Sequence, residues 1–230
     1  MSDRRLSTSR LLGLLLPLLV PVLCLCTCLR LEMNSPTLYN QGFVRYDIPA
    51  STGLPASQLD AITARLIRYF NSLDATPQMR VTNLAGSTFD LFHDYEVVHL
   101  EDVKRLFAFN SSLQALSLLL LLALCAIGFS HGRRVDVAAG LRRGALFTLG
   151  LLAVTGTLFV ADFDWAFVGF HLVAFDNSFW QLDPSTDFLV RLFPWGFWQD
   201  MSLLAGIATG LTAGAILLLA RMAGQGDTND

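Results

Sequence analysis

The chain has 230 residues, of which 53% are hydrophobic and only 15% are charged, and its mean hydropathy is +0.50. This composition excludes an ordinary soluble domain and indicates a membrane protein. The net charge of −3 says little about partners. The arginine clusters are too short to suggest nucleic acid, so we interpret them as topology signals.

The first apolar run extends from Leu11 to about Leu31, which is long enough to span a bilayer core. A cleavable signal peptide is the alternative, but the run is longer than a usual signal core and no small-residue cleavage motif follows it. We therefore expect a retained helix, kinked at Pro17 and Pro21. The four cysteines lie inside apolar runs, so we expect buried thiols that pack as small apolar groups, with neither a disulfide framework nor a metal site.

Residues 32–111 form a polar insert of mixed character. Within it, apolar side chains recur at spacings of three and four residues from Leu59 to Phe70, which predicts an amphipathic helix that ends near Ser72. Ser57 is the expected N-cap of this helix. We expect residues 36–55 to be irregular or to form short strands, and a strand within residues 80–89.

Three further apolar runs predict three more spans, at residues 113–129, 144–160 and 201–219. Gly150 and Gly156 in the third span would allow close helix approach. Gly206, Gly210 and Gly214 recur every four residues in the fourth span, which predicts a packing face for a neighbouring helix or for a second copy in a dimer.

Arginines mark the same side of the membrane before the first span, between the second and third spans, and after the fourth, and the positive-inside rule places this side in the cytoplasm. The sequence thus predicts an all-α membrane protein with four transmembrane helices, cytoplasmic N and C termini, and a small extracytoplasmic α+β or irregular domain between helices 1 and 2. The predicted order is a cytoplasmic N-terminus with the first span (1–31), the extracytoplasmic domain with the lead-in to the second span (32–111), the second span (112–130), a cytoplasmic loop (131–143), the third span (144–163), an outer aromatic loop with His171 (164–200), the fourth span (201–221) and a cytoplasmic tail (222–230).

This topology places His93, His99 and His171 on the outer side and His131 on the cytoplasmic side. If the second and third helices continue beyond the bilayer core, the rings of His99 and His171 project just above it. Glu96 and Asp102 lie three residues before and after His99, so on one helix both carboxylates reach the imidazole and suit it to general-base work. A solvated helix end with incidental ion pairs is the structural alternative. The ligand spacing matches no specific metal motif, so we expect no metal and no cofactor.

Two stretches resemble the motifs of a bacterial family of four-span membrane proteins. Glu96-Val-Val-His99-Leu-Glu-Asp102-Val-Lys104 is similar to the family pattern E-x-x-H-M-x-D-V-K, with Leu100 in place of the usual methionine. The second stretch combines Phe170-His171 with Phe175, Asn177, Trp180, Asp183-Pro184, Asp187 and Leu192-Phe193-Pro194, and has Trp195 where an acidic residue is expected. The characterised members are the lipoprotein intramolecular transacylases, called Lit.

The resemblance implies an enzyme that moves the sn-2 acyl chain of a diacylglyceryl-cysteine lipoprotein to its own N-terminal amine, giving a lyso-form lipoprotein. It implies diacylated lipoproteins and membrane lipid as partners, a place in the bacterial cytoplasmic membrane, and a site on the extracytoplasmic face. His99 and His171 match the catalytic histidines, and orienting or substrate-binding roles are expected for Glu96, Asp102, Lys104, Asn177, Trp180 and Asp183. The alternatives are another outer-leaflet lipid acyltransferase or hydrolase, or a non-catalytic membrane scaffold.

Overall fold

The computed structural model describes the backbone of residues 2–225 and the side chains of residues 8–224. The side chains of Arg4 and Arg5 and the last part of the predicted tail, residues 226–230, lie outside the described residues. The chain divides into two compact units. The first comprises residues 2–29, 110–161 and 203–225, and the second comprises residues 30–109 and 162–202.

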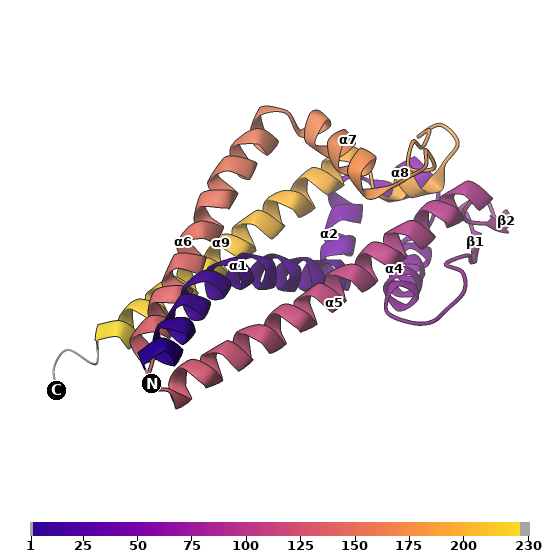
Figure 1. The fold of residues 1–230 in the computed structure, drawn as a ribbon. Coiled ribbons are helices and arrows are strands. Elements are labelled where there is room, and N and C mark those ends of the chain that lie inside the picture. The colour runs from indigo at the N-terminus through magenta and orange to yellow at the C-terminus, as the bar shows by residue number, and fades with distance from the viewer. Residues whose placement is uncertain (1, 226–230) are drawn as a thin grey trace. The chain divides into compact units, whose positions relative to one another are not determined.

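Four long helices are apolar enough to cross a membrane, as the sequence predicts. They carry few charges, and their length exceeds the roughly 20 residues that a bilayer core requires. Figure 1 labels them as α1 (Ser2–Met33), α5 (Asp94–Ser130), α6 (Arg134–Ala161) and α9 (Trp195–Gln225).

The predicted loop at residues 131–143 is wrong, because α6 already begins at Arg134. Only a tight turn separates α5 from α6, and Gly132 adopts the left-handed conformation there (φ 68°). One face of the early part of α6 is buried, with Val137 exposed by only 2%. This burial stabilises a helix over a stretch whose arginines suggest a loop.

Within the first unit, α1 and α6 approach closely at two glycines of α6. A Cβ atom on Gly140 would lie 2.8 Å from the Leu16 side chain, and one on Gly144 would lie 2.7 Å from Cβ of Val20. By contrast, Gly150, Gly156, Gly206 and Gly214 have open space at the corresponding position, and Gly210 has only Leu152 at 3.7 Å. The close approach expected at Gly150 and Gly156 is therefore wrong; it occurs earlier in α6, at Gly140 and Gly144.

The thiols of Cys24, Cys26 and Cys28 are free and buried, as expected of small apolar side chains. Specific polar contacts join helices of this unit. The Gln114 side chain donates to the Thr27 hydroxyl at 3.0 Å, and the Ser9 hydroxyl donates to the Asp136 carboxylate at 2.7 Å.

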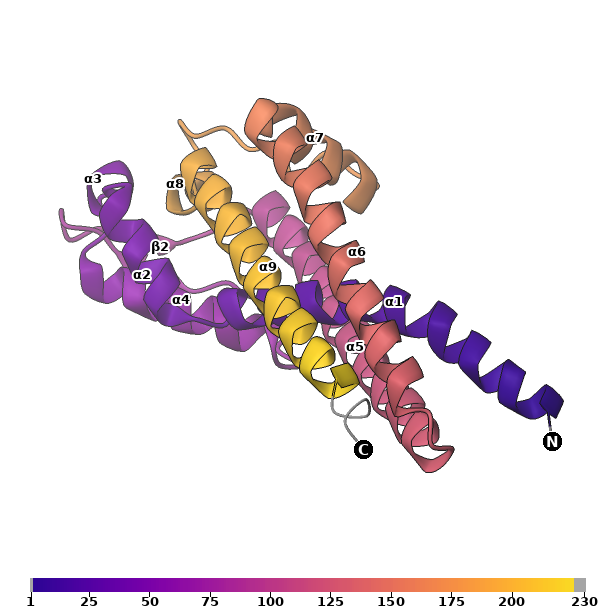
Figure 2. The same cartoon turned by 90° about the vertical axis from the view of Figure 1, so that its left-hand side faces the viewer.

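The second unit gathers short elements around one hydrophobic core. Two of its helices, α2 and α4, contact each other, as Figure 2 shows. Its complete short elements are α2 (Pro36–Arg45), α3 (Ile48–Thr52), α4 (Ala56–Phe70), β1 (Arg80–Thr82), β2 (Thr88–Asp90), α7 (Phe163–Ala174) and α8 (Phe188–Leu192).

Helices α2 and α3 replace the irregular or strand structure that we expected for residues 36–55. Pro36 occupies the first turn of α2, where its missing N–H costs nothing and its fixed φ favours the helix. Tyr39 and Phe43, one turn apart, are buried and contact the ring of Phe193 at centroid distances of 5.7 and 5.9 Å. This aromatic packing keeps so short a helix folded.

The predicted amphipathic helix is confirmed as α4, whose buried face includes Leu59, Ile62 and Leu66. The expected cap is wrong: extended Pro55 is the N-cap, and Ser57 already lies inside the first turn. A two-stranded antiparallel hairpin follows, with Val81 opposite Phe89. The strand expected within residues 80–89 is therefore two short strands.

His171 does not lie on a continuation of the third span, contrary to expectation. Asp162 has an extended backbone (φ −155°), and its carboxylate accepts a hydrogen bond from the Trp165 N–H at 2.9 Å. An aspartate N-cap starts a new helix, so His171 belongs to α7 and not to α6.

Candidate active site

The start of α5 places three polar side chains of the second unit on one buried face. Glu96, His99 and Asp102 follow each other at intervals of three residues, and their exposed fractions are 0%, 7% and 9%. Burial of two carboxylates and an imidazole is costly unless partners satisfy them. Their hydrogen bonds therefore indicate what each residue does.

Glu96 holds backbone groups of two elements. One carboxylate oxygen accepts from the N–H of His93, directly before α5, at 2.7 Å, and the other accepts from the N–H of Leu189 in α8 at 2.7 Å. The first contact is the return half of a capping box, in which a glutamate at the third helical position satisfies an orphan N–H at the helix start. Glu96 thus fixes where α5 begins and ties it to α8.

His99 of α5 and His171 of α7 lie side by side. Their ring centroids are 6.2 Å apart and the ring planes are inclined by 30°. Phe175, directly after α7, contacts both rings at 5.0 and 5.5 Å. The structure therefore brings together two histidines that are 72 positions apart in the sequence.

The hydrogen bond of His171 identifies its tautomer. Its Nδ1 lies 2.7 Å from the carbonyl oxygen of Phe167, one turn earlier in α7. A carbonyl only accepts, so Nδ1 carries the proton and Nε2 of the neutral ring has a free lone pair.

Burial also favours the neutral form of His171. It lowers the pKa of His171 below the ordinary value, against the hydrogen bond to Phe167, which raises it. Nε2 is therefore available to accept a proton at neutral pH.

His99 has an unsatisfied ring nitrogen. Its Nδ1 is buried and has no hydrogen-bond partner among the described side chains and backbone groups. Such orphaned polar atoms are rare in folded proteins, and a catalytic role is one of their recognised explanations.

Aromatic rings enclose the histidine pair. The Phe167 centroid lies 4.2 Å and the Trp180 centroid 4.8 Å from that of His171, and Phe170 meets it edge-on at 5.4 Å. Phe167 was absent from our expected site residues, although its position four residues before His171 on an apolar helix is a usable signal. An apolar wall of this kind strengthens electrostatic interactions within it.

Asp102 connects α5 to the segment after α7. Its Oδ2 accepts from the Asn177 side-chain amide at 2.7 Å, and its Oδ1 accepts from Arg105 at 2.6 Å. The Asn177 carbonyl oxygen accepts in turn from the N–H of Phe179 at 3.0 Å. This chain of hydrogen bonds fixes the segment that carries Trp180.

Two of the expected site residues are engaged elsewhere. Lys104 donates to the backbone carbonyl of Asp74 at 2.6 Å and lies 4.1 Å from the centroid of Tyr69. Asp183 accepts from the N–H and hydroxyl of Ser185, and these hydrogen bonds lower its pKa, so it shapes a turn. Neither side chain is brought to the histidine pair.

A second polar cluster at the start of α5 surrounds Asp187. Asp187 accepts from the Tyr95 hydroxyl at 2.5 Å, the Thr186 hydroxyl at 2.7 Å and the Asp183 N–H at 2.7 Å. Burial raises its pKa, but these hydrogen bonds outweigh burial and hold the pKa below the ordinary value. His93 is exposed and stacks on Tyr95 at 5.3 Å, so it belongs to the rim of this cluster. Among the described residues, no group of three His, Cys, Asp or Glu side chains is arranged to hold a metal ion.

Four long apolar helices define a multi-pass membrane protein, and a buried pair of histidines within aromatic walls is its candidate active site. The sequence model of the family described as lipoprotein intramolecular transacylase Lit matches residues 14–198. The chain belongs to this family.

Similar proteins support the same fold. The membrane-integral lipoprotein intramolecular transacylase Lit from Bacillus cereus superimposes with a TM-score of 0.82 at 15% identity, covering 96% of this chain and 98% of that one. A histidine-to-alanine variant of that enzyme matches with a TM-score of 0.77 at 14% identity, covering 99% of each chain. An uncharacterised protein of Aquifex aeolicus is 35% identical over 121 residues, and this match spans about half of each sequence, 52%.

Proposed function

We propose that this protein transfers the sn-2 acyl chain of a diacylglyceryl-cysteine lipoprotein from the glycerol oxygen to the α-amino group of the same cysteine. Family membership supports the reaction class, and the buried pair of His99 and His171 supports the chemistry. The observation that carries the proposal is the tautomer of His171, because it leaves Nε2 free to accept a proton beside a second imidazole.

In the proposed reaction, one proton moves from the amine to the glycerol oxygen. The neutral amine attacks the ester carbonyl, a C–N bond forms, and Nε2 of His171 takes the amine proton. When the C–O bond breaks, His99 donates its N–H proton to the glycerol oxygen while the His171 imidazolium passes the amine proton to the other nitrogen of His99, so no imidazolate forms and both rings end neutral. Exchange of the His99 proton with solvent then restores its starting tautomer. General acid–base catalysis of this kind contributes about 10²–10⁴-fold.

The tetrahedral intermediate carries a negative oxygen that requires donors. The indole of Trp180 lies beside His171 and is our candidate donor, whereas Lys104 is held by Asp74 and Tyr69. Both reacting groups belong to one lipoprotein, so positioning within the aromatic enclosure supplies much of the rate. Asp102 and Asn177 act as positioning residues.

We also propose that the site faces outward from the cytoplasmic membrane and that both termini are cytoplasmic. The distribution of arginines supports this orientation: Arg10, Arg142, Arg143 and Arg221 all mark one side. Accessibility of single cysteines to a membrane-impermeant thiol reagent tests it.

Mass spectrometry of the N-terminal peptide of a diacylated lipoprotein, incubated with the purified enzyme, tests the function. We expect the wild type to give a peptide that is N-acylated and retains one ester-linked chain. His99→Ala and His171→Ala should each lower this product at least about 100-fold, whereas His131→Ala, a matched control on an exposed turn, should leave it unchanged.

Two results would overturn the proposal. Release of free fatty acid without an N-acyl peptide would indicate a lipid hydrolase. Full activity of either histidine variant would exclude the two-histidine mechanism.

A further inference from the structure

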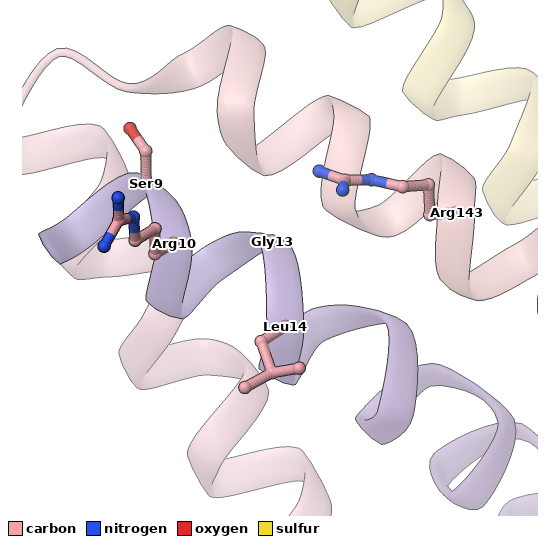
Figure 3. A pocket seen from close by; sticks show the side chains of 5 residues that line it. All are labelled: Ser9, Arg10, Gly13, Leu14 and Arg143. Carbon is pink, nitrogen blue, oxygen red and sulfur yellow. The ribbon is translucent and has the colours of Figure 1, made fainter. Parts of the chain in front are cut away.

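A shallow, open cavity on the surface of the first unit lies between α1 and α6. Its volume is about 490 Å³, and Ser9, Arg10, Gly13, Leu14 and Arg143 line it. Figure 3 shows the guanidinium of Arg143 extending from α6 toward α1, while Ser9 and Arg10 project from one turn of α1.

The absence of a side chain at Gly13 makes room for one of these cations. A Cβ atom at Gly13 would lie 3.4 Å from Nη2 and 3.6 Å from Nη1 of Arg143, so the guanidinium rests over the bare backbone of α1. Nε of Arg143 donates to the carbonyl of Ala139 at 3.2 Å, which orients the group and leaves its terminal nitrogens toward the cavity.

The positive charge of the cavity is not neutralised within the part of the chain that the structure describes. Neither Arg10 nor Arg143 forms an ion pair with a described carboxylate. The nearby carboxylate of Asp136 accepts from the Ser9 hydroxyl at 2.7 Å and pairs with Arg133 at 3.4 Å. Two permanent cations therefore face one cavity.

The cavity adjoins an apolar surface suited to hydrocarbon. Leu14 at its edge is 64% exposed, and Leu18, one turn further along α1, is 52% exposed. Both belong to a helix that is apolar enough to cross a membrane. A ligand with an anionic head and an acyl chain would match the guanidinium groups and these leucines together.

From this combination we infer that the cavity binds the phosphate of an anionic glycerophospholipid, with its acyl chain along Leu14 and Leu18. Guanidinium forms charge-assisted and often bidentate hydrogen bonds with phosphate. The same two cations would also attract free phosphate. The exposed Leu14 and Leu18 favour a lipid, because only a lipid has an acyl chain to cover them. The occupant would be a bound membrane lipid, independent of the lipoprotein that is acylated.

The experiment uses the full-length protein, purified in detergent and stripped of lipid. Phosphatidylglycerol, phosphatidylcholine or inorganic phosphate is added, and bound ligand is quantified by native mass spectrometry. We expect phosphatidylglycerol to bind about tenfold more tightly than phosphatidylcholine, because the two guanidinium groups repel the choline cation that accompanies the phosphate of phosphatidylcholine. Inorganic phosphate should neither bind comparably nor displace the lipid.

Three variants distinguish binding at this cavity from non-specific attraction of the lipid to the positive surface. Arg143→Gln should weaken phosphatidylglycerol binding about tenfold. Gly13→Leu should do the same by filling the cavity while keeping both charges. Arg142→Gln removes the same charge from the neighbouring position of α6, outside the cavity lining, and should bind as the wild type does.

Equal binding by the Arg143→Gln and Arg142→Gln proteins would overturn the inference. Equal binding of the two phospholipids would also overturn it, as would displacement of the lipid by inorganic phosphate, which would indicate a site for a soluble anion. None of these measurements depends on acyl transfer, so their outcome is distinguishable from that of the proposed function.

Discussion

The side-chain amide of Asn177 donates to the carboxylate of Asp102 at 2.7 Å and thereby joins α5 to the segment after α7. Because α5 carries His99 and this segment carries Trp180, the hydrogen bond holds these two parts of the proposed site together. Hydrogen bonds to charged groups contribute about 1.5–3 kcal/mol to stability.

We expect Asn177→Ala and Asp102→Ala each to lower kcat roughly tenfold with a smaller effect on KM. In both variants the histidine pair remains, but the segment that carries Trp180 is no longer held to α5. A double-mutant cycle on kcat measures the coupling. If the two effects simply add, the bond has no positioning role. Arg105→Ala, which removes the other partner of Asp102, is the control and should retain most of the activity.

The carboxylate of Glu96 should matter for folding more than for chemistry. Glutamine in its place turns an amide N–H₂ toward one of two backbone N–H groups, so we expect Glu96→Gln to lower the free energy of unfolding by about 1–3 kcal/mol. Thermal unfolding in detergent measures this loss. Glu101→Gln makes the same chemical change in the next turn of α5, and an equal loss in that protein would contradict the capping role.

The lowered pKa of His171 predicts a dependence of stability on pH. In the unfolded chain a histidine titrates near its ordinary pKa of about 6.5. Above this value both states are neutral at this position. Below it the unfolded state binds a proton that the folded state does not, so the folded state loses stability as the pH falls.

The unfolding temperature of the wild type should therefore fall more steeply from about pH 7.5 to about pH 5.5 than that of His171→Gln, which cannot titrate at this position. Parallel curves for the two proteins would show that His171 does not resist protonation.

The contact between α1 and α6 predicts contrasting effects of one substitution. Gly144→Ala places a methyl group 2.7 Å from Cβ of Val20 and 3.2 Å from the carbonyl of Leu16, so we expect a loss of about 1–3 kcal/mol of stability. Gly150→Ala adds the same group to the same helix where nothing lies within 4 Å, and it should be neutral. Thermal unfolding of both proteins provides the test, and equal losses would exclude a close contact at Gly144.

The four long helices could be predicted from the sequence because the length of an apolar run is a strong signal for a membrane span. The long apolar runs identified the four helices, and the three-residue spacing of Glu96, His99 and Asp102 placed them on one helical face. The same spacing could not reveal that Glu96 holds backbone groups, because its partner Leu189 is distant in sequence.

The failures have physical causes that are visible at particular residues. We expected residues 36–55 to be irregular or to form short strands, yet Pro36 at the first helical turn favours a helix. Arginines near residue 134 suggested a loop, yet burial of Val137 made that stretch helical. Lys104 stands in the motif beside the histidine, but it points to Asp74 and Tyr69 through a long-range contact that no local pattern encodes.

The break at Asp162 has a consequence for how this family can vary. Each residue added to a continuous helix turns everything beyond it by about 100°, so a histidine on an unbroken α6 would change direction with every insertion in the span. Because Asp162 starts a separate helix, the register of His171 is counted from this cap and not from the span. The apolar length of α6 can therefore adapt to bilayers of different thickness without rotating the imidazole.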